Sequence, residues 1–327
     1  MSTVSRDGPG PVARQVIACD VGGTRIKAGL VDASGQVRHA VTAPTPVVAG
    51  DGDATATAVL DRLARLAAEL GEAAGAPPAA LGAVVPGLVD AAAGMALYSE
   101  NLGWRDVPFA RRLADATGLA VAFDHDVRAA GAAEQRLGAG RGRRDVAFVP
   151  IGTGIAAALV LDGRPYAGGG WAGEIGHIDV GSGLACACGG TGCLETVATA
   201  AAIARRYTER SGHPVPGALE VAARLTARDP DAAAVWDQAV GALAVALAVT
   251  AAVAAPELIV IGGGLSGAGD VLLKALRQRL DTRITPPQRN PELRITALGD
   301  QAGLLGAALL AWRQAGVEMA EPEPQSR

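Results

Sequence analysis

The sequence is poor in aromatic residues and in lysine. Phe, Trp and Tyr make up 3% of the 327 residues although 50% are hydrophobic, so we expect a core built mainly from Ala, Val and Leu. Lysine occurs only at Lys27 and Lys274. Neither lysine follows the glycine spacing of a Walker-type phosphate loop, which excludes that motif. The formal net charge of −4 disfavours a general nucleic-acid-binding protein, which needs a basic face.

Long apolar runs are also scarce. The longest, residues 240–255, is shorter than the roughly 20 residues that span a bilayer, and Pro256 and Glu257 end it. We expect a buried helix at a domain interface there, and no membrane partner. Residues 1–14 are polar and do not resemble a signal peptide. Because the few cysteines have a metal-type spacing, we expect a cytoplasmic protein.

Three of the 4 cysteines, Cys186, Cys188 and Cys193, lie in one glycine-rich segment, and His177 precedes them. Three thiolates and one imidazole form a standard tetrahedral set for structural zinc. The alternative is a disulfide with one unpaired thiol, but a Cys-x-Cys bridge is strained. Two carboxylates, Glu174 and Glu195, lie at the two ends of this segment.

Two parts of the chain share a strand–turn–strand pattern with glycine and threonine in the turn. The first joins residues 15–20 to residues 26–31 through Gly22, Gly23 and Thr24, and a short third strand through Val37 follows. The second joins residues 145–151 to residues 155–161 through Gly152, Thr153 and Gly154. Glycine lets backbone N–H groups approach an anion, and threonine adds a hydroxyl. We therefore predict duplicated halves whose glycine hairpins hold one polyphosphate.

Further strands and helices alternate along the chain, which indicates an α/β fold with mixed sheets. The apolar spacing of Val59, Leu63, Leu66 and Leu70 predicts an amphipathic helix over residues 53–70. The other predicted strands cover residues 79–85, 119–123 and 258–261, and the other predicted helices cover residues 126–137, 302–314 and a segment that starts at about Ser266.

Polar residues gather where predicted strands end. Asp124, His125 and Asp126 follow one strand, where α/β proteins bind ligands, although Asp126 alone is equally consistent with a helix N-cap. Asn101 lies in a glycine-containing loop before Trp104. Several carboxylates and an amide around a metal-bound loop suit a ligand with many hydroxyl groups, because carboxylates are strong hydrogen-bond acceptors.

These segments together resemble the ROK family, named for repressors, open reading frames and kinases, to which bacterial glucokinases belong. The resemblance covers residues 15–316 and is most specific in the cysteine segment. The matching segments are Asp20–Thr24, Pro86–Asp90, Asn101–Trp104, Gly152–Gly154, Glu174–His177, Cys186–Glu195 and Gly262–Gly264.

The resemblance implies the two-lobed actin-like, ribonuclease-H-like ATPase fold, with ATP between the lobes. Asp126 would be the base that takes the proton from the 6-hydroxyl of a hexose, most simply glucose. The sugar would contact Asn101, His125, Glu174, His177 and Glu195, with His177 also on zinc. The hairpin residues and Asp20 would face Mg²⁺ and the phosphates, and Gly262, Gly263 and Gly264 would face the adenosine.

The same resemblance sets the expected organisation. Residues 15–125 would form the smaller lobe, completed by a helix at 302–316, and residues 126–301 would form the larger lobe, with the zinc loop at 177–195. Residues 1–14 and 317–327 are expected to be disordered tails. Members of the family assemble as homodimers or homotetramers, and we expect the same here.

The sequence departs from the family pattern in three respects. Asp124-His125-Asp126 stands where Glu-Asn-Asp is usual, so an imidazole replaces an amide that would touch the sugar. Ala156, Ala157 and Ala158 replace glycines after the second hairpin and would leave less room for a phosphate, and Arg25 replaces lysine. The His125 change could redirect sugar preference, make activity depend on pH, or reduce it.

Two other functions compete with a glucose kinase that uses ATP. The chain could phosphorylate N-acetylmannosamine, N-acetylglucosamine, fructose or allose, or use polyphosphate as the donor. It could also be a sugar-binding regulator without catalysis. Family repressors carry a winged helix before the first strand, whereas only a short polar segment without a basic stripe precedes that strand here, which disfavours DNA binding.

Overall fold

The structure is a computed structural model that describes residues 14–320, so most of the two predicted tails lies outside the described residues. The chain divides into two compact units. Unit 1 contains the chain up to Ala129 together with the chain from Gly303, and unit 2 contains Ala130–Ala302. The division therefore falls inside helix α3 (Asp126–Leu137), a few residues beyond the boundary expected from the sequence.

Each unit is built on a five-stranded mixed sheet, and the two sheets have the same strand order. In unit 1 the order is β3-β2-β1-β4-β8, and in unit 2 it is β11-β10-β9-β12-β13. In both, the first three strands are antiparallel and the last two run parallel to the central one. The predicted duplication is thus confirmed in the topology. The strands of unit 1 are β1 (Gln15–Val21), β2 (Arg25–Asp32), β3 (Val37–Pro44), β4 (Leu81–Val85) and β8 (Val121–His125); those of unit 2 are β9 (Val146–Pro150), β10 (Ala158–Leu161), β11 (Arg164–Tyr166), β12 (Leu258–Gly262) and β13 (Glu292–Ile295).

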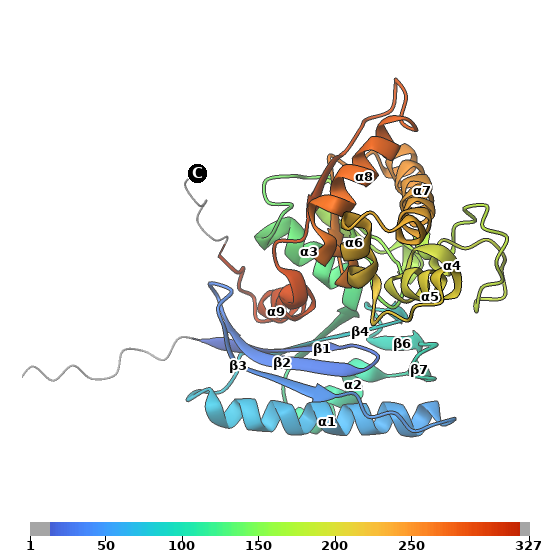
Figure 1. Cartoon of the computed structure of the whole chain (residues 1–327). Coiled ribbons are helices and arrows are strands. Elements are labelled where there is room, and N and C mark those ends of the chain that lie inside the picture. The colour runs from blue at the N-terminus through green and yellow to red at the C-terminus, as the bar shows by residue number, and fades with distance from the viewer. Residues whose placement is uncertain (1–13, 321–327) are drawn as a thin grey trace, which may run out of the picture. The chain divides into compact units, whose positions relative to one another are not determined.

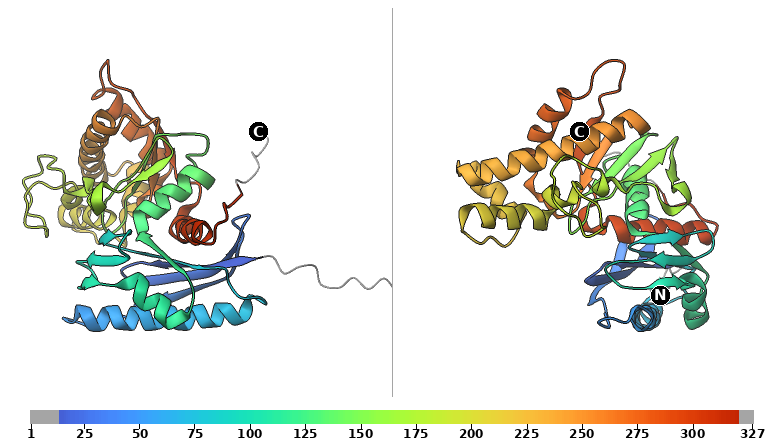
Figure 2. Two further views of the ribbon diagram at one scale, coloured as in Figure 1. Left: turned by 180° about the vertical axis from the view of Figure 1, so that it is seen from behind. Right: turned by 90° about the vertical axis from the view of Figure 1, so that its right-hand side faces the viewer.

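Helices cover both faces of the unit 1 sheet. Helix α1 (Gly52–Ala73) begins where the Asp51 side chain accepts the N–H of Ala54, and its predicted apolar stripe is buried. It lies on one face with α2 (Phe109–Thr117), and α9 (Ala302–Gln314) lies on the other (Figures 1 and 2). A side chain at Gly82 would overlap with the Ala307 carbonyl, so this glycine allows α9 to pack directly on β4. A small antiparallel sheet of β5 (Leu88–Asp90), β6 (Met95–Tyr98) and β7 (Arg105–Val107) completes the unit.

Unit 2 carries most of the helices in the described part of the chain, and α7 (Pro230–Ala254) is the longest. Helix α7 begins at Pro230, where the Asp229 side chain accepts two backbone N–H groups. By length and composition it could cross a membrane, but half of its most apolar window is buried, and Leu243 and Leu247 belong to the core of the unit. The predicted buried helix is therefore a core helix. The other helices are α4 (Glu195–Ala198), α5 (Ala200–Ser211), α6 (Ala218–Thr226) and α8 (Asp270–Asp281).

Three predicted boundaries were wrong, each for a local reason. The third strand begins at Val37 and continues to Pro44, because its pairing with β2 extends beyond the turn. The strand expected from Ile155 begins only at Ala158, and Ile155 makes a single bridge to Ile151. The helix expected near Ser266 is a short 3₁₀ segment, η3 (Gly264–Ala268), because Gly269 has a φ of 53° and separates it from α8.

Candidate functional site

The first glycine hairpin joins β1 to β2 in unit 1. The turn closes with the N–H of Gly22 donating to the Arg25 carbonyl at 2.9 Å, and the Thr45 hydroxyl donates to the Gly22 carbonyl at 2.7 Å. The tip, Gly23 and Thr24, is exposed. Asn101 lies beside it, since its Cβ is 3.8 Å from where a Cβ on Gly23 would stand. The hairpin therefore presents backbone N–H groups and a hydroxyl next to the predicted amide.

The second hairpin joins β9 to β10 in unit 2, and a glycine N–H closes its turn as well, over a loop one residue shorter. The Gly152 N–H donates to the Gly154 carbonyl at 3.0 Å, and the Gly152 carbonyl accepts the N–H of Ala200 at 3.1 Å. Gly263, with a φ of 71°, packs against the Ile151 backbone so closely that a Cβ would lie 2.5 Å from its carbonyl oxygen. The Gly262–Gly264 segment thus lies directly behind this hairpin.

The alanines that follow the second hairpin do not crowd its tip. Ala157 and Ala158 are 5% and 3% exposed and face the interior of unit 2, whereas Thr153 and Gly154 are exposed. The sequence analysis expected all three alanines, Ala156 included, to leave less room for a phosphate. The buried orientation of Ala157 and Ala158 leaves only Ala156, which is half-buried, near the exposed part of the turn.

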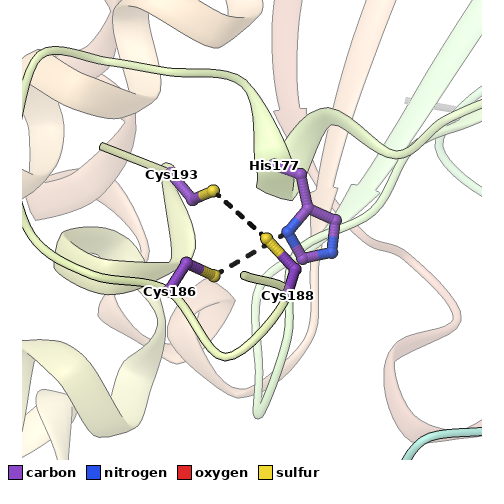
Figure 3. A group of neighbouring side chains, drawn as sticks. All are labelled: His177, Cys186, Cys188 and Cys193. Atoms are coloured by element: carbon purple, nitrogen blue, oxygen red, sulfur yellow. Dashed lines mark hydrogen bonds between the residues drawn. The ribbon is translucent and has the colours of Figure 1, made fainter. Parts of the chain in front are cut away.

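The cysteine segment and His177 form one four-donor cluster. All four cysteines of the chain are free thiols, and the donor atoms of His177, Cys186, Cys188 and Cys193 lie within 4.8 Å of one another (Figure 3). The sulfurs of Cys188 and Cys193 are 3.6 Å apart, and Nδ1 of His177 is 4.0 Å from the sulfur of Cys186. Bonds of about 2.0–2.3 Å to a tetrahedral zinc ion place ligand atoms roughly 3.3–3.8 Å apart. The donor set fits zinc, and the disulfide alternative does not apply.

The thiols of the cluster differ in their surroundings. Burial, followed by the neighbouring Cys188, raises the pKa of Cys193 to about 12 in the absence of metal. The backbone N–H of Gly190, which donates to the Cys188 sulfur at 3.4 Å, lowers the pKa of Cys188, and Cys186 adds to this effect. A cation bound at the centre would favour the thiolate form of all three residues.

Both flanking carboxylates connect the cluster to its surroundings. Glu174 Oε2 is 3.9 Å from Nε2 of His177, the ring nitrogen that points away from the sulfurs. Glu195, two residues after Cys193, accepts the N–H of Ile155 on Oε1 at 2.6 Å. A Cβ on Gly154 or Gly176 would come within 2.8 Å of the same oxygen. Glu195 therefore ties the cysteine segment to the second hairpin.

The end of β8 holds a second group of polar residues. Asp124 accepts the Nε and Nη2 hydrogens of Arg128, the former at 2.8 Å, so this carboxylate is paired within the group. Nδ1 of His125 accepts the N–H of Arg128 at 3.4 Å, as an N-cap side chain does. The proton of the neutral imidazole is thereby assigned to Nε2, which lies 3.3 Å from Oδ1 of Asp126. His125 makes the capping contact. The two contacts of Asp126, with His125 and with the N–H of Val127 at 2.7 Å, both use Oδ1.

Unit 1 thus holds Asp20, Asn101, His125 and Asp126, and unit 2 holds Glu174, His177, Glu195, the metal cluster and Gly262–Gly264. The structure brings Glu195 against the second hairpin and Asn101 against the first. Asp20 is the penultimate residue of β1 and lies beside the start of α9, where Gly303 leaves it room. Arg128 was missed by the sequence analysis, and its position four residues after Asp124 on α3 was the available signal.

Two α/β units with the same strand order, each opening in a glycine–threonine hairpin, define an actin-like ATPase fold. The ROK family profile matches residues 16–314, and the chain belongs to the ROK family. A glucokinase of Halalkalibacterium halodurans is 36% identical over 319 residues, covering 92% of this chain and 96% of the relative.

Solved structures agree with the family assignment. A ROK hexokinase from Thermus thermophilus superposes with a TM-score of 0.76 at 34% identity, covering 92% of this chain and 99% of that chain. A ROK family glucokinase from Streptomyces griseus, in complex with glucose and AMPPNP, has a TM-score of 0.76 at 30% identity and covers 91% and 99%. The predicted family and fold are confirmed.

Proposed function

We propose that the protein is an ATP-dependent sugar kinase that phosphorylates the 6-hydroxyl of a hexose, with glucose as the first candidate. One observation carries the proposal: Glu195 joins the cysteine cluster to the second glycine hairpin through the 2.6 Å hydrogen bond from Ile155. A carboxylate suited to sugar hydroxyls and a turn suited to phosphates thus belong to one assembly. The glucokinase of H. halodurans and the glucose and AMPPNP complex of the S. griseus enzyme support the choice of substrates.

In this proposal each unit contributes part of the chemistry. Asp126 accepts the proton of the attacking hydroxyl, and Asn101 binds a further sugar hydroxyl beside the first hairpin. From unit 2, Glu174, His177 and Glu195 bind sugar hydroxyls. The N–H groups of both hairpins, with Thr24 and Thr153, bind phosphate oxygens, and Gly262–Gly264 border the adenosine. Phosphoryl transfer depends chiefly on positioning and on charge neutralisation, which suits a site without a covalent nucleophile.

Two metal ions fit this chemistry. Mg²⁺, held with the phosphates near Asp20, would neutralise charge that develops on the transferred group. Zinc on His177, Cys186, Cys188 and Cys193 would have four protein ligands and so no open position for chemistry. Its proposed task is to hold Glu174, His177 and Glu195 in one arrangement.

A sugar and donor panel tests the function. The purified protein, with Mg²⁺ and either ATP or polyphosphate, should phosphorylate glucose with a higher kcat/KM than N-acetylglucosamine, N-acetylmannosamine, fructose or allose. A product resistant to periodate at carbon 6 would support the 6-hydroxyl as the acceptor. If none of these sugars is phosphorylated with either donor, the proposal is wrong.

Substitution of the proposed base tests the mechanism. Asp126→Asn should lower kcat by about a thousandfold or more, because the attacking hydroxyl loses its proton acceptor. Glucose binding measured by calorimetry should remain within a few-fold of the unmodified protein. Asp124→Asn is the matched control at the end of the same strand, because the Asp124 carboxylate is paired with Arg128 and is not the proposed base. Full activity in Asp126→Asn would remove Asp126 from the mechanism.

A further inference from the structure

A cavity lies within unit 2, between α5, α7 and the loop that carries the cysteines. Its volume is about 860 Å³, which is ample for a drug-sized or sugar-sized ligand. Three arginines line it, Arg205 and Arg206 on α5 and Arg283 after α8. The proposed kinase chemistry uses Glu195 and Thr153 at its margin and leaves the arginines without a role.

Arg206 is the unusual member of this group. Its Nη2 donates to the side chain of Gln238, but its Nη1 is buried and has no acceptor among the described residues. Burial, and then the positive charge of Arg205, lowers the pKa of Arg206. A buried guanidinium nitrogen without an acceptor is unfavourable, so a small rotation of the Arg206 side chain toward the cavity would let an anion there supply the acceptor.

The other charges leave the cavity positive. Arg205 is paired with Glu209 at 3.6 Å and donates to the Thr196 carbonyl at 3.3 Å. Arg283 is exposed, and in the described part of the chain it has no carboxylate within ion-pair distance. Two guanidinium groups, those of Arg206 and Arg283, are thus available to an anion.

The lining also limits the kind of anion. Guanidinium groups bind phosphate oxygens through paired N–H donors, which favours a phosphate group. The lining includes Ser182, Thr199 and Gln238, which suit hydroxyl groups, and it contains no aromatic side chain on which a nucleobase would stack. These features favour a phosphorylated polyol over a nucleotide.

We infer that this cavity is a binding site for a phosphate monoester of a small polyhydroxylated molecule, with Arg206 and Arg283 as its phosphate ligands. The assignment of a sugar phosphate rests on the proposed function, because a hexose kinase produces that class of molecule. Leu184, Ala185 and Cys186 of the cysteine loop, and Glu195, also line the cavity. A ligand there would contact the loop that holds the proposed sugar-binding residues, so the product class would regulate the enzyme from a cavity that borders the proposed sugar site.

Calorimetry with two probes, inorganic phosphate and glucose 6-phosphate, tests the site in the full-length protein. Both should bind in the presence of saturating glucose, and glucose 6-phosphate should bind more tightly. Arg206→Gln should weaken both by about tenfold or more, and Arg283→Gln, an exposed change that leaves the fold intact, by several-fold. Arg210→Gln is the matched control, because Arg210 also lies on α5 but pairs with Asp231 at 2.7 Å outside the cavity.

The outcomes separate this inference from the proposed function, since the binding measurement requires neither ATP nor turnover. Loss of phosphate binding in Arg206→Gln supports the cavity whatever the kinase assay gives. Three results would overturn the inference: no binding of either probe, binding that glucose abolishes, or affinities unchanged in both arginine variants. If the unmodified protein binds neither probe and Arg206→Gln changes the mass measured by sedimentation, the cavity would instead be assigned to contact with a second copy of the chain.

Discussion

At the scale of single residues, His125 is one of the departures from the family pattern expected from the sequence, and the structure shows which groups its ring contacts. Both ring nitrogens are engaged within the strand end, Nδ1 with the N–H of Arg128 and Nε2 with Asp126. With these two contacts the imidazole orients the proposed base, Asp126. A contact between the imidazole and a sugar would have to replace one of these two contacts. The structure therefore favours a positioning role for His125 over a direct loss of kinase activity.

Substitution of His125 tests this role. His125→Ala should lower kcat between about tenfold and a hundredfold with a small change in the KM for sugar, because the Asp126 carboxylate loses its orienting partner. His125→Asn, which can still donate a hydrogen bond, should recover part of the loss. Initial rates over a range of sugar concentrations give both constants. A large rise in KM at unchanged kcat would show instead that His125 binds the sugar.

Substitution of Cys188 tests the proposed link between the zinc ion and the proposed sugar-binding residues. Cys188→Ser should lose zinc, measured by elemental analysis, and raise the KM for sugar about tenfold or more, because Glu174, His177 and Glu195 lose their common anchor. Cys19→Ala is the control, since Cys19 is buried in β1 and lies outside the cluster. Loss of zinc with unchanged sugar binding would contradict the proposed task of the metal.

At the scale of elements, Glu134 joins α3 to the segment that follows β13. Its side chain is fully buried and accepts the N–H groups of Ala139 and Leu298 at 2.9 Å each. It also accepts the N–H of Ala297 at 3.3 Å and the hydroxyl of Thr296. Because four donors bind this buried carboxylate, it stabilises the contact between α3 and the segment that follows β13. Burial of the same carboxylate without hydrogen bonds would destabilise the fold.

Removal of this carboxylate should be costly. Glu134→Ala should lower the free energy of unfolding by about 3 kcal/mol, because four donors lose their acceptor in a buried place. Glu72→Ala, at an exposed position near the end of α1, should change it by less than about 0.5 kcal/mol. Urea unfolding gives both values. A loss below about 1 kcal/mol in Glu134→Ala would mean that water replaces the carboxylate.

At the scale of the whole molecule, carboxylates with lowered pKa values occur in both units. Hydrogen bonds from Ser34 and Gln36 lower the pKa of Asp32 in unit 1, overcoming the opposite effect of burial. In unit 2 the N–H of Arg144 lowers the pKa of Glu257, and the side chain of Arg294 lowers that of Glu292. Arg143 also pairs with Glu257 at 3.3 Å and with Glu292 at 3.0 Å. Arg143, in the segment before β9, is therefore held by two ion pairs.

These shifts set the response to acid. A carboxyl whose folded pKa is lowered stabilises the fold above its unfolded pKa and loses that contribution as the pH falls through the folded value. Because the ordinary value for glutamate is 4.5, the urea midpoint should hold from pH 7 to about pH 5 and fall below about pH 4.5. Glu257→Gln should be less stable at pH 7 and show a smaller fall. An identical pH dependence in both proteins would contradict this account.

Much of the fold and part of the site could be predicted, because they depend on short stretches of chain. The spacing of Cys186, Cys188 and Cys193, the two glycine–threonine turns and the apolar stripe of α1 are local patterns, and each has the predicted structure. The contacts of Glu134 with Thr296 and of Glu195 with Ile155 join residues far apart in sequence. No local pattern indicates such pairs, so neither was predicted.

The amino-acid sequence by itself determined the family, the duplicated hairpins and the metal donors, since backbone freedom at glycine and the chemistry of thiols and imidazole are properties of the residues. Only the tertiary structure decided that His125 caps α3 and contacts Asp126, and that Glu195 reaches the second hairpin. It also decided that a buried nitrogen of Arg206 has no acceptor within residues 14–320. The physical reason is that the burial and the hydrogen-bond partners of a side chain depend on the residues packed around it. Two residues of the same type can therefore differ in both properties.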